Sequence, residues 1–406
     1  MTKYFFLFFL CIAIINISYS FFNYKKLISQ EIQHDKFKVK NIYPKKNYFI
    51  LKLYNNNITF WTSMNKNEQN ITIGDVVSTY FLTNQIDFIS YNKGFYAKSF
   101  DTVKQQKQQN IFDDIKLYIQ NQHKNDMTKE LYSAIFLSTA ISKSVREVCV
   151  DFGVSHLVAI SGFHLGVLTF VLYWFFYMFY NFFHKKYFPY RNIKFDILIV
   201  VFISLFAYLY LLGTVASLIR AYIMSLFALI LHRSNIKIFS FYTLFIIVGI
   251  IISIFPSLIF SLSLWLSVFG VFYIFLFIKY FSRLNKYFLF LFFNIWIYLS
   301  LSPIIFYIFE IASIHQLYSP LFSIAFSLFY PLAIFLHIIN QGNLLDDILI
   351  VWLKTDIKSF DIVLSQYFIM LYFIVSLLSI RYLYAFWLLN IMMVGTFIYF
   401  LGYLIQ

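Results

Sequence analysis

Long apolar runs separated by short polar connections occupy most of the sequence after residue 153. Of the 406 residues, 61% are hydrophobic and only 12% are charged. So few charges could not cover the surface of a soluble protein of this length. The runs are close to the roughly 20 residues that a helix needs to cross a bilayer. The sequence therefore predicts a polytopic α-helical membrane protein.

We expect a series of membrane spans from Val154 onward. They lie near residues 154–180, 195–212, 218–232, 238–255, 257–278, 287–309, 364–380 and 383–405. Connections rich in Lys and Arg alternate with connections that lack them; the basic ones are 181–194, 233–237, 279–286 and 381–382. Basic connections face the cytoplasm in membrane proteins. We therefore expect a multi-pass protein of the inner (cytoplasmic) membrane with residues 23–153 in the periplasm.

The apolar segment 311–340 does not fit this series simply. Ser319-Pro320 and Pro331 interrupt it, and the acidic connection 341–361 that follows suits an external loop. The alternation of loops is kept if 311–340 is re-entrant or consists of two half-helices. Broken backbone at membrane depth is tolerated only where it is buried in protein or lines water. We therefore expect this segment to be a pore or gate element.

The part of the chain before the main spans divides into three. Residues 1–22 are an apolar run that we interpret as a retained membrane anchor rather than a cleaved signal peptide, because no clear small-x-small cleavage site precedes Asn23. Residues 23–110 contain short alternating segments with polar turns, which predict a small β domain, in the form of a barrel. Residues 111–153 show amphipathic helical periodicity and are expected to be a connector to a membrane domain over residues 154–406.

Charge and cysteine content limit the chemistry. The net charge is +14, of which residues 23–153 contribute +6, from 18 Lys and Arg against 12 Asp and Glu. A weakly basic soluble domain attracts nucleic acid or anionic lipid. Cys11 and Cys149 have no metal-site or disulfide spacing, and no HxH, HExxH or G-x-x-x-x-G-K-[ST] pattern occurs. We expect no metal, no cofactor and no catalytic residue.

Polar residues gather at the start of the first long run, in the segment HLVAISGFHLG from His156 to Gly166. On a continuous helix, His156 and His164 lie about 80° apart and Ser161 about 60° beyond His164, so all three share one face. Gly162 and Gly166 form a G-x-x-x-G pair that allows close helix approach. One interpretation is a packing seam; the other is a wet path, because polar groups in hydrocarbon usually face a cavity or the bundle interior.

A second polar face lies on the predicted short span 218–232, where Ser217 and Arg220 recur with small residues. The guanidinium of Arg220 stays charged and needs an anion, water or carbonyl groups. Glu310, at the external end of another predicted span, is a candidate ion-pair partner, and a passing phosphate is another. The alternative is that Arg220 reaches out to the membrane interface.

An intramembrane serine hydrolase is a third interpretation of Ser161 and its neighbouring histidines. Such a site needs a hydrogen bond between the nucleophile and its base. Ser161 and His164, three positions apart on one helix, would rarely align in that way. We therefore rank hydrolysis below transport.

HLVAISGFHLG, followed by SLIRAYIM from Ser217, resembles the ComEC family of competence DNA-import channels. The matching positions are His156, Leu157, Ala159, Ile160, Ser161, Gly162 and His164 in the first motif, and Ser217, Arg220 and Ala221 in the second. The segment from Phe255 is similar to a third family motif at Pro256, Leu264, Ser267, Val268 and Gly270, although Phe255 replaces an acidic residue. The resemblance covers roughly residues 30–340.

The resemblance implies that the β domain is an OB-like periplasmic domain able to touch single-stranded DNA. It implies that the membrane domain passes one DNA strand into the cytoplasm during natural transformation. Many members carry a metallo-β-lactamase-like domain, whose H-x-H-x-D-H pattern this sequence lacks. Separate DNA-receptor, motor and nuclease proteins are then the expected partners, beside membrane lipids and a potential homo-oligomer. The competing class is a transporter of small anions or lipids.

Overall fold

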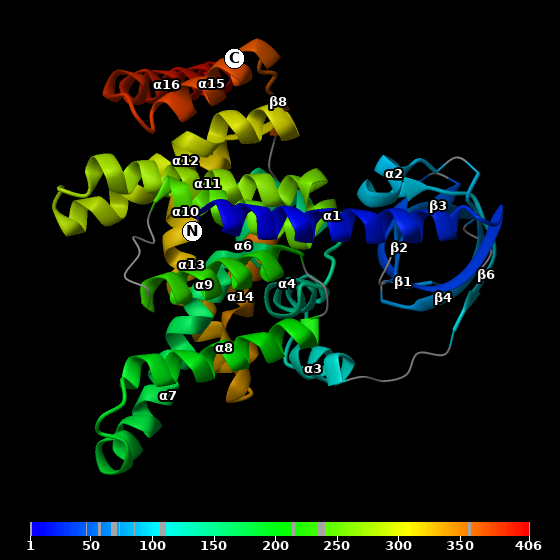
Figure 1. Ribbon diagram of the computed structural model, residues 1–406, viewed down its shortest axis with the longest axis horizontal. Coiled ribbons are helices and arrows are strands. Elements are labelled where there is room, and N and C mark those ends of the chain that lie inside the picture. The colour runs from blue at the N-terminus through cyan, green and yellow to red at the C-terminus, as the bar shows by residue number, and fades with distance from the viewer. Residues whose placement is uncertain are drawn as a thin grey trace. The chain divides into compact units, whose positions relative to one another are not determined.

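The computed structural model describes residues 2–45, 47–55, 58–65, 71–72, 74–84, 86–105, 111–212, 216–233, 240–355 and 359–405 (Figure 1). Two compact units make up the chain. The first consists of residues 1–111 and 246–264, and the second of residues 112–245 and 265–406. The expected turn at 55–57 and the expected non-basic connection at 213–217 fall partly outside the described residues.

The first unit contains a long N-terminal helix and a β-sheet. Its elements before residue 111 are α1 (Thr2–Leu27), β1 (Ile32–Pro44), β2 (Tyr48–Tyr54), β3 (Thr59–Asn65), β4 (Val76–Leu82), α2 (Phe88–Lys93), β5 (Phe95–Tyr96) and β6 (Ser99–Lys104). The alternating segments predicted within residues 23–110 form a β-sheet, so the expected β structure is confirmed. Helix α1 is longer than the apolar run 1–22, since it continues through Lys25 and Lys26.

The sheet has the strand order β5-β3-β2-β1-β4-β6. The long strand β1 pairs with β4 through its first half and with β2 through its second half, and both partners are antiparallel. The outermost strands β5 and β6 are almost continuous in sequence. Between them, Ala97 N–H donates to the carbonyl of Trp61 on β3, and Leu82 N–H on β4 donates to the carbonyl of Lys98. One stretch of chain therefore bridges both edges, and the sheet closes on itself.

Alternation along the strands fills the interior of this closed sheet. Phe37 and Val39 on β1, Leu51 and Leu53 on β2, and Phe60 on β3 are each at most 1% exposed. Phe60 stacks on Phe81 and packs edge-on against Phe37. Because successive strand residues point to opposite faces, the residues between these core positions are directed outward. They include most of the lysines of β1 and β2.

Helix α1 is fastened to the sheet domain at its C-terminal end. The Tyr24 hydroxyl donates to the carbonyl of Ile86 at 3.1 Å, and the Ser20 hydroxyl donates to Asn92 Oδ1 at 2.8 Å. Phe21 and Tyr24 also pack on Phe88 of α2. The remaining exposed residues of α1 are mostly apolar, as a membrane anchor requires.

The second unit is helical. The elements after residue 110, of which η1 and parts of α3, α10 and α11 belong to the first unit, are α3 (Ile111–Gln120), α4 (Asp126–Leu137), α5 (Lys143–Asp151), α6 (Ser155–Val158), α7 (Gly162–Tyr187), α8 (Ile193–Leu212), α9 (Ala216–Arg233), α10 (Phe241–Ile254), η1 (Pro256–Phe260), α11 (Leu262–Phe281), α12 (Lys286–Phe309), β7 (Ile311–Ser313), η2 (Ile314–Tyr318), α13 (Ser319–Ile338), η3 (Gly342–Leu345), α14 (Asp346–Leu353), β8 (Ser359–Asp361), α15 (Gln366–Leu378) and α16 (Leu383–Ile405).

Most predicted spans are helices within a few residues of their predicted bounds. Seven described helices are long and apolar enough to cross a membrane: α1, α7, α8, α11, α12, the segment Ile314–Ile338, and α16. The helices α9, α10 and α15 are apolar but shorter. The mostly helical class is confirmed, and the lengths and low charge of these helices are compatible with a polytopic membrane protein.

Two local predictions were wrong. The segment 154–180 is not one helix, because residues 159–161 are extended and separate α6 from α7. The angular argument for His156 and His164 on one face therefore fails. Ser319-Pro320 does not break the segment 311–340 near its middle; it begins α13, where proline is tolerated in the first turn. Helix α13 then continues through Pro331 to Ile338, so of the two predicted arrangements the pair of half-helices is not observed.

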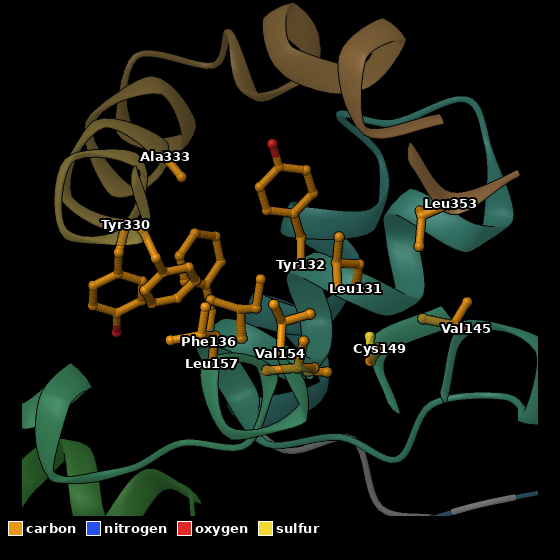
Figure 2. Close-up of a cluster of buried hydrophobic side chains, with 14 of the residues drawn as sticks. Leu131, Tyr132, Phe136, Val145, Cys149, Val154, Leu157, Tyr330, Ala333 and Leu353 are labelled. Atoms are coloured by element: carbon orange, nitrogen blue, oxygen red, sulfur yellow. The ribbon is translucent and has the colours of Figure 1, made fainter. Parts of the chain in front are cut away.

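The connector helices share a core with the membrane helices. Leu131, Tyr132 and Phe136 of α4 pack in one buried cluster with Tyr330 and Ala333 of α13 (Figure 2). Cys149 of α5 is buried in the same cluster and is not disulfide-bonded. The N-cap of α4 is Asn125, whose side chain accepts from Met127 N–H.

Candidate functional site

Ser161 is the N-cap of α7 rather than a residue within a helix. Its backbone is extended (φ −129°, ψ 179°), and its hydroxyl accepts from the backbone N–H of Phe163 at 3.3 Å. Ser161 N–H in turn donates to Nδ1 of His164 at 3.2 Å. Serine at this position and a side-chain acceptor three residues later form a capping box. The A-I-S-G-x-H motif therefore encodes a helix start.

The same turn brings the Ser161 hydroxyl within 3.3 Å of His164 Nδ1. The expectation that these two groups would not meet was wrong, because capping geometry, not helix periodicity, places them. His164 is 1% exposed, between Phe326 and Tyr330 of α13. Its Nε2 has no hydrogen-bond partner among the described residues, so no third side chain there orients the ring as a catalytic triad requires.

The second motif lies directly against the first. The Ser217 hydroxyl on α9 donates to the carbonyl of Ile160 at 2.7 Å. A Cβ added to Gly162 would lie 3.6 Å from the Cβ of Ala221, so α7 and α9 approach closely there. At Gly166 an added Cβ would meet nothing within 4 Å. Of the predicted G-x-x-x-G pair, only Gly162 therefore lies at the helix contact.

Arg220 lies one turn beyond Ser217 and is 3% exposed. Its side chain is thus taken into the protein interior rather than extended to a surface. Glu310 is exposed, adopts a left-handed conformation (φ 53°) and ends α12. Among the described residues no ion pair joins Glu310 to Arg220, so that candidate pairing is not observed.

His156 belongs to α6 and is exposed. Its Nε2 lies 3.3 Å from the hydroxyl of Ser323 on α13. That hydroxyl donates to the carbonyl of Ser319, so it accepts from His156. The predicted polar residues therefore lie at a junction of α6, α7, α9 and α13. At this junction His156 on α6 is exposed, whereas Arg220 on α9 is buried.

The β domain presents a second candidate site, which its alternating sequence pattern predicted only in part. Lys36, Lys38 and Lys40 alternate on β1 with the buried Phe37 and Val39, and all three lysines are exposed. Alternate side chains on a strand recur about every 7 Å. The outer face of β1 is therefore a line of cations, which we call the β1 lysine line.

Aromatic rings lie at both ends of the β1 lysine line. At one end His34, Tyr80 and Phe100 form an exposed stack across β1, β4 and β6, with ring centroids 4.3 Å and 5.7 Å apart. At the other end Tyr54 of β2 and Trp61 of β3 are half-buried. Sequence reasoning did not single out these rings, because their partners come from strands distant in sequence.

Two lysines at the second end lie side by side over these rings. Lys40 Nζ is 5.6 Å from the centre of the Tyr54 ring, and Lys52 Nζ is 4.7 Å from that of Trp61. Desolvation by the surrounding protein lowers the pKa of both lysines, and the charge of Lys52 lowers the pKa of Lys40 further. An anion placed between them would relieve that repulsion.

No group of three or more His, Cys, Asp or Glu that could hold a metal ion occurs in the described part of the chain. The two candidate sites therefore offer cations, aromatic faces, hydroxyls and imidazoles. That set suits binding and passage of a polyanion.

Together the two units define a class: a multi-pass membrane protein that also carries a closed β domain. Within that class the match is specific. A family model described as "Competence protein" matches residues 138–405, so the chain belongs to the competence protein family, of the ComEC/Rec2 type. The resemblance drawn from the motifs is thereby confirmed. Comparisons with curated proteins and with solved structures find no match.

Proposed function

We propose that this chain is the inner-membrane channel component that passes single-stranded DNA into the cytoplasm during natural transformation. Membership of the competence family supports a role in DNA uptake. The observation that carries the finer proposal is the β1 lysine line with aromatic rings at both ends. Proteins that bind single strands without sequence preference combine a basic track with rings on which bases stack.

The strand connectivity supports an OB-like barrel for residues 23–110. A strand shared by two neighbours, a closed sheet of antiparallel pairs and one parallel pair between β3 and β5 fit that fold. OB-folds bind oligonucleotides on the face that includes their second and third strands. Lys52 and Trp61 occupy that face here.

The junction of α6, α7, α9 and α13 supports the location of the membrane path. His156, Ser161, His164, Ser217 and Arg220 cluster there, whereas a plain helix seam would need only apolar and small residues. We propose that Arg220 meets passing phosphates and that the other four brace the helix starts beside it. In this account the chain moves the strand without cutting it, and a separate nuclease degrades the other strand.

DNA binding by the full-length protein in detergent tests the β1 lysine line. Lys36→Ala and Lys38→Ala should each weaken binding of a fluorescent oligonucleotide. Each should also reduce the slope of log affinity against log salt by about 0.7, the value for one phosphate contact on a single strand. Lys143→Ala, an exposed lysine on α5, is the matched control and should change neither. Unchanged affinity and slope in the β1 variants would refute the interface.

Location is tested by alkaline phosphatase fusions. Enzyme fused after Gln105 should be active, because residues 23–153 are proposed to be periplasmic. Enzyme fused after Lys186 should be inactive, because basic connections remain in the cytoplasm. The opposite pair of results would reverse the orientation.

The competing function is transport of small anions or lipids. It uses the same intramembrane Arg220 but has no need of a basic, ring-lined β domain. Loss of DNA import in Lys36→Ala and Lys38→Ala cells, with protein amounts unchanged, favours the DNA channel over this alternative.

A further inference from the structure

Three titratable side chains from three elements meet in the interior of the second unit, away from both candidate sites. His123 lies between α3 and α4, His337 in the last turn of α13, and Asp346 at the start of α14. They are 4%, 5% and 7% exposed. His123 Nδ1 is 2.8 Å from Asp346 Oδ1, and His123 Nε2 is 3.0 Å from His337 Nε2.

The partner of His337 fixes where the hydrogens must be. His337 Nδ1 lies 2.7 Å from the carbonyl oxygen of Ala333, which can only accept. His337 Nδ1 therefore carries a hydrogen, and its Nε2 is an acceptor when the ring is neutral. His123 must then donate from Nε2. A neutral imidazole carries one N–H, so His123 Nδ1 presents a lone pair to Asp346.

The hydrogen count leaves the cluster one proton short. Three hydrogen bonds need three hydrogens, whereas two neutral imidazoles and a carboxylate hold only two and leave a buried negative charge. One added proton completes the chain and makes the cluster neutral. A second added proton would set two N–H groups face to face at the 3.0 Å contact and bury a positive charge.

Among the described residues, no neighbouring group supplies this hydrogen. Tyr132 of α4 stacks on the His123 ring at 4.4 Å, and its buried hydroxyl has no hydrogen-bond partner among the described residues. The Thr128 hydroxyl, 3.5 Å from Asp346 Oδ2, gives its hydrogen to the carbonyl of Asn125. The charge of Lys129 lowers the pKa of His123, but Lys129 itself is ion-paired with Asp126 at 3.0 Å.

Burial lowers the pKa of His123, and the Asp346 carboxylate opposes that effect. The hydrogen count places the added proton in the 2.8 Å contact between Asp346 Oδ1 and His123 Nδ1. With that proton, three hydrogen bonds follow one another. They run from Asp346 through His123 and His337 to the carbonyl of Ala333.

We propose that His123, His337 and Asp346 form a binding site for one proton, which fastens the α3–α4 loop to the end of α13 and the start of α14. Other hydrogen bonds join the same elements, and we call this contact between the α3–α4 loop, the end of α13 and the start of α14 the seam. Tyr118 and Gln122 of that segment donate to the carbonyl of His337, and Gly342 N–H donates to Gln122 Oε1. Release of the proton breaks one bond of the chain and leaves a charge inside, so the seam loosens.

The sign of the pH dependence follows from the proton count. Between pH 7 and 9 the unfolded chain holds Asp346 ionised and both histidines neutral, while the folded cluster holds one proton more. Stability therefore falls as pH rises wherever the folded state binds the extra proton. An asparagine at position 346 would donate the same hydrogen from its amide and would not titrate.

Melting of the full-length protein in detergent, measured by tryptophan fluorescence from pH 7 to 9, tests the site. Relative to Asp346→Asn, the wild-type midpoint should fall by on the order of 2 °C per pH unit. Asp346→Asn should melt within about 2 °C of wild type at pH 7, whereas Asp346→Ala should melt well below both. The exposed neighbour provides the control, since Asp347→Asn should keep the wild-type slope.

Equal pH slopes for wild type and Asp346→Asn would overturn the proposal. So would an Asp346→Asn protein that melts as low as Asp346→Ala at pH 7, or that fails to accumulate, because the amide is expected to complete the hydrogen-bond chain.

Discussion

The Ser217 hydroxyl on α9 donates a 2.7 Å hydrogen bond to the backbone carbonyl of Ile160, the residue just before the N-cap of α7. Residues 159–161 are extended, so this carbonyl lacks the helical partner it would otherwise have. The bond ties two motifs that lie 57 positions apart in sequence. It explains why serine stands at this place in the second motif.

Ser217→Ala should destabilise the protein by about 1–3 kcal/mol, because the half-buried junction then leaves the Ile160 carbonyl unsatisfied. The measurement is denaturation of the full-length protein in detergent. Ser225→Ala on the same helix is the control: its hydroxyl donates to the carbonyl of Tyr222 within α9, so a smaller change is expected. Equal losses of stability in the two variants would show that the hydrogen bond between the helices contributes no more than the one within α9.

Ser161→Ala should cost about 1 kcal/mol, the usual value for a lost N-cap, and should leave most DNA import intact. In our account Ser161 starts α7 and has no covalent role. Import by cells carrying the variant, normalised to protein amount, gives the answer. Complete loss of import at normal protein levels would instead favour Ser161 as a nucleophile.

Lys40→Met should weaken single-strand binding while raising stability. Burial and the charge of Lys52 lower the pKa of Lys40, so its charged form is held at a cost in the fold. The unfolded chain then binds more protons near that lowered pKa, and this lysine makes stability rise with pH. Lys40→Met removes that contribution. Melting curves and oligonucleotide titrations at several pH values separate the two effects; a variant both less stable and weaker in binding contradicts the account.

Gly94→Ala should destabilise the β domain by about 1–3 kcal/mol. Gly94 has φ 100°, which residues with a Cβ rarely adopt, and an added Cβ would lie 2.7 Å from Cζ3 of Trp61. The ring would have to leave its place below Lys52. Hydrogen exchange of β3 and β5 reports the loosening. Gly74→Ala is an informative control, because Gly74 also has positive φ but meets nothing within 4 Å; equal losses would mean that strain alone, without Trp61, accounts for the effect.

The sequence predicted the helices and strands well because their hydrophobic patterns are strong. Alternation of buried Phe37 and Val39 with lysines marks β1, and apolar runs mark α8, α11, α12 and α16. The failures came from local chemistry. Ser161 is both a membrane-motif residue and an N-cap, and Pro320 opens a helix instead of breaking one.

The candidate sites were predictable only where a motif carried them. The motif residues His164 and Ser217 do meet at one junction, although for reasons of capping that periodicity did not suggest. The exposed stack of His34, Tyr80 and Phe100 joins three strands, and its register is set by pairing that no sequence spacing encodes. His123 and Asp346 are likewise 223 positions apart, so only the fold reveals their contact.

Import of labelled DNA tests the central claim most directly. A host strain lacking its own copy receives the wild-type chain, Arg220→Ala or no chain, and nuclease-protected label in the cytoplasm is measured after external DNA is digested. We predict that the wild-type chain restores entry of one labelled strand. Arg220→Ala should abolish entry at matched protein levels, because the buried guanidinium is proposed to meet the phosphates. Equal cytoplasmic label with and without the chain would contradict the account.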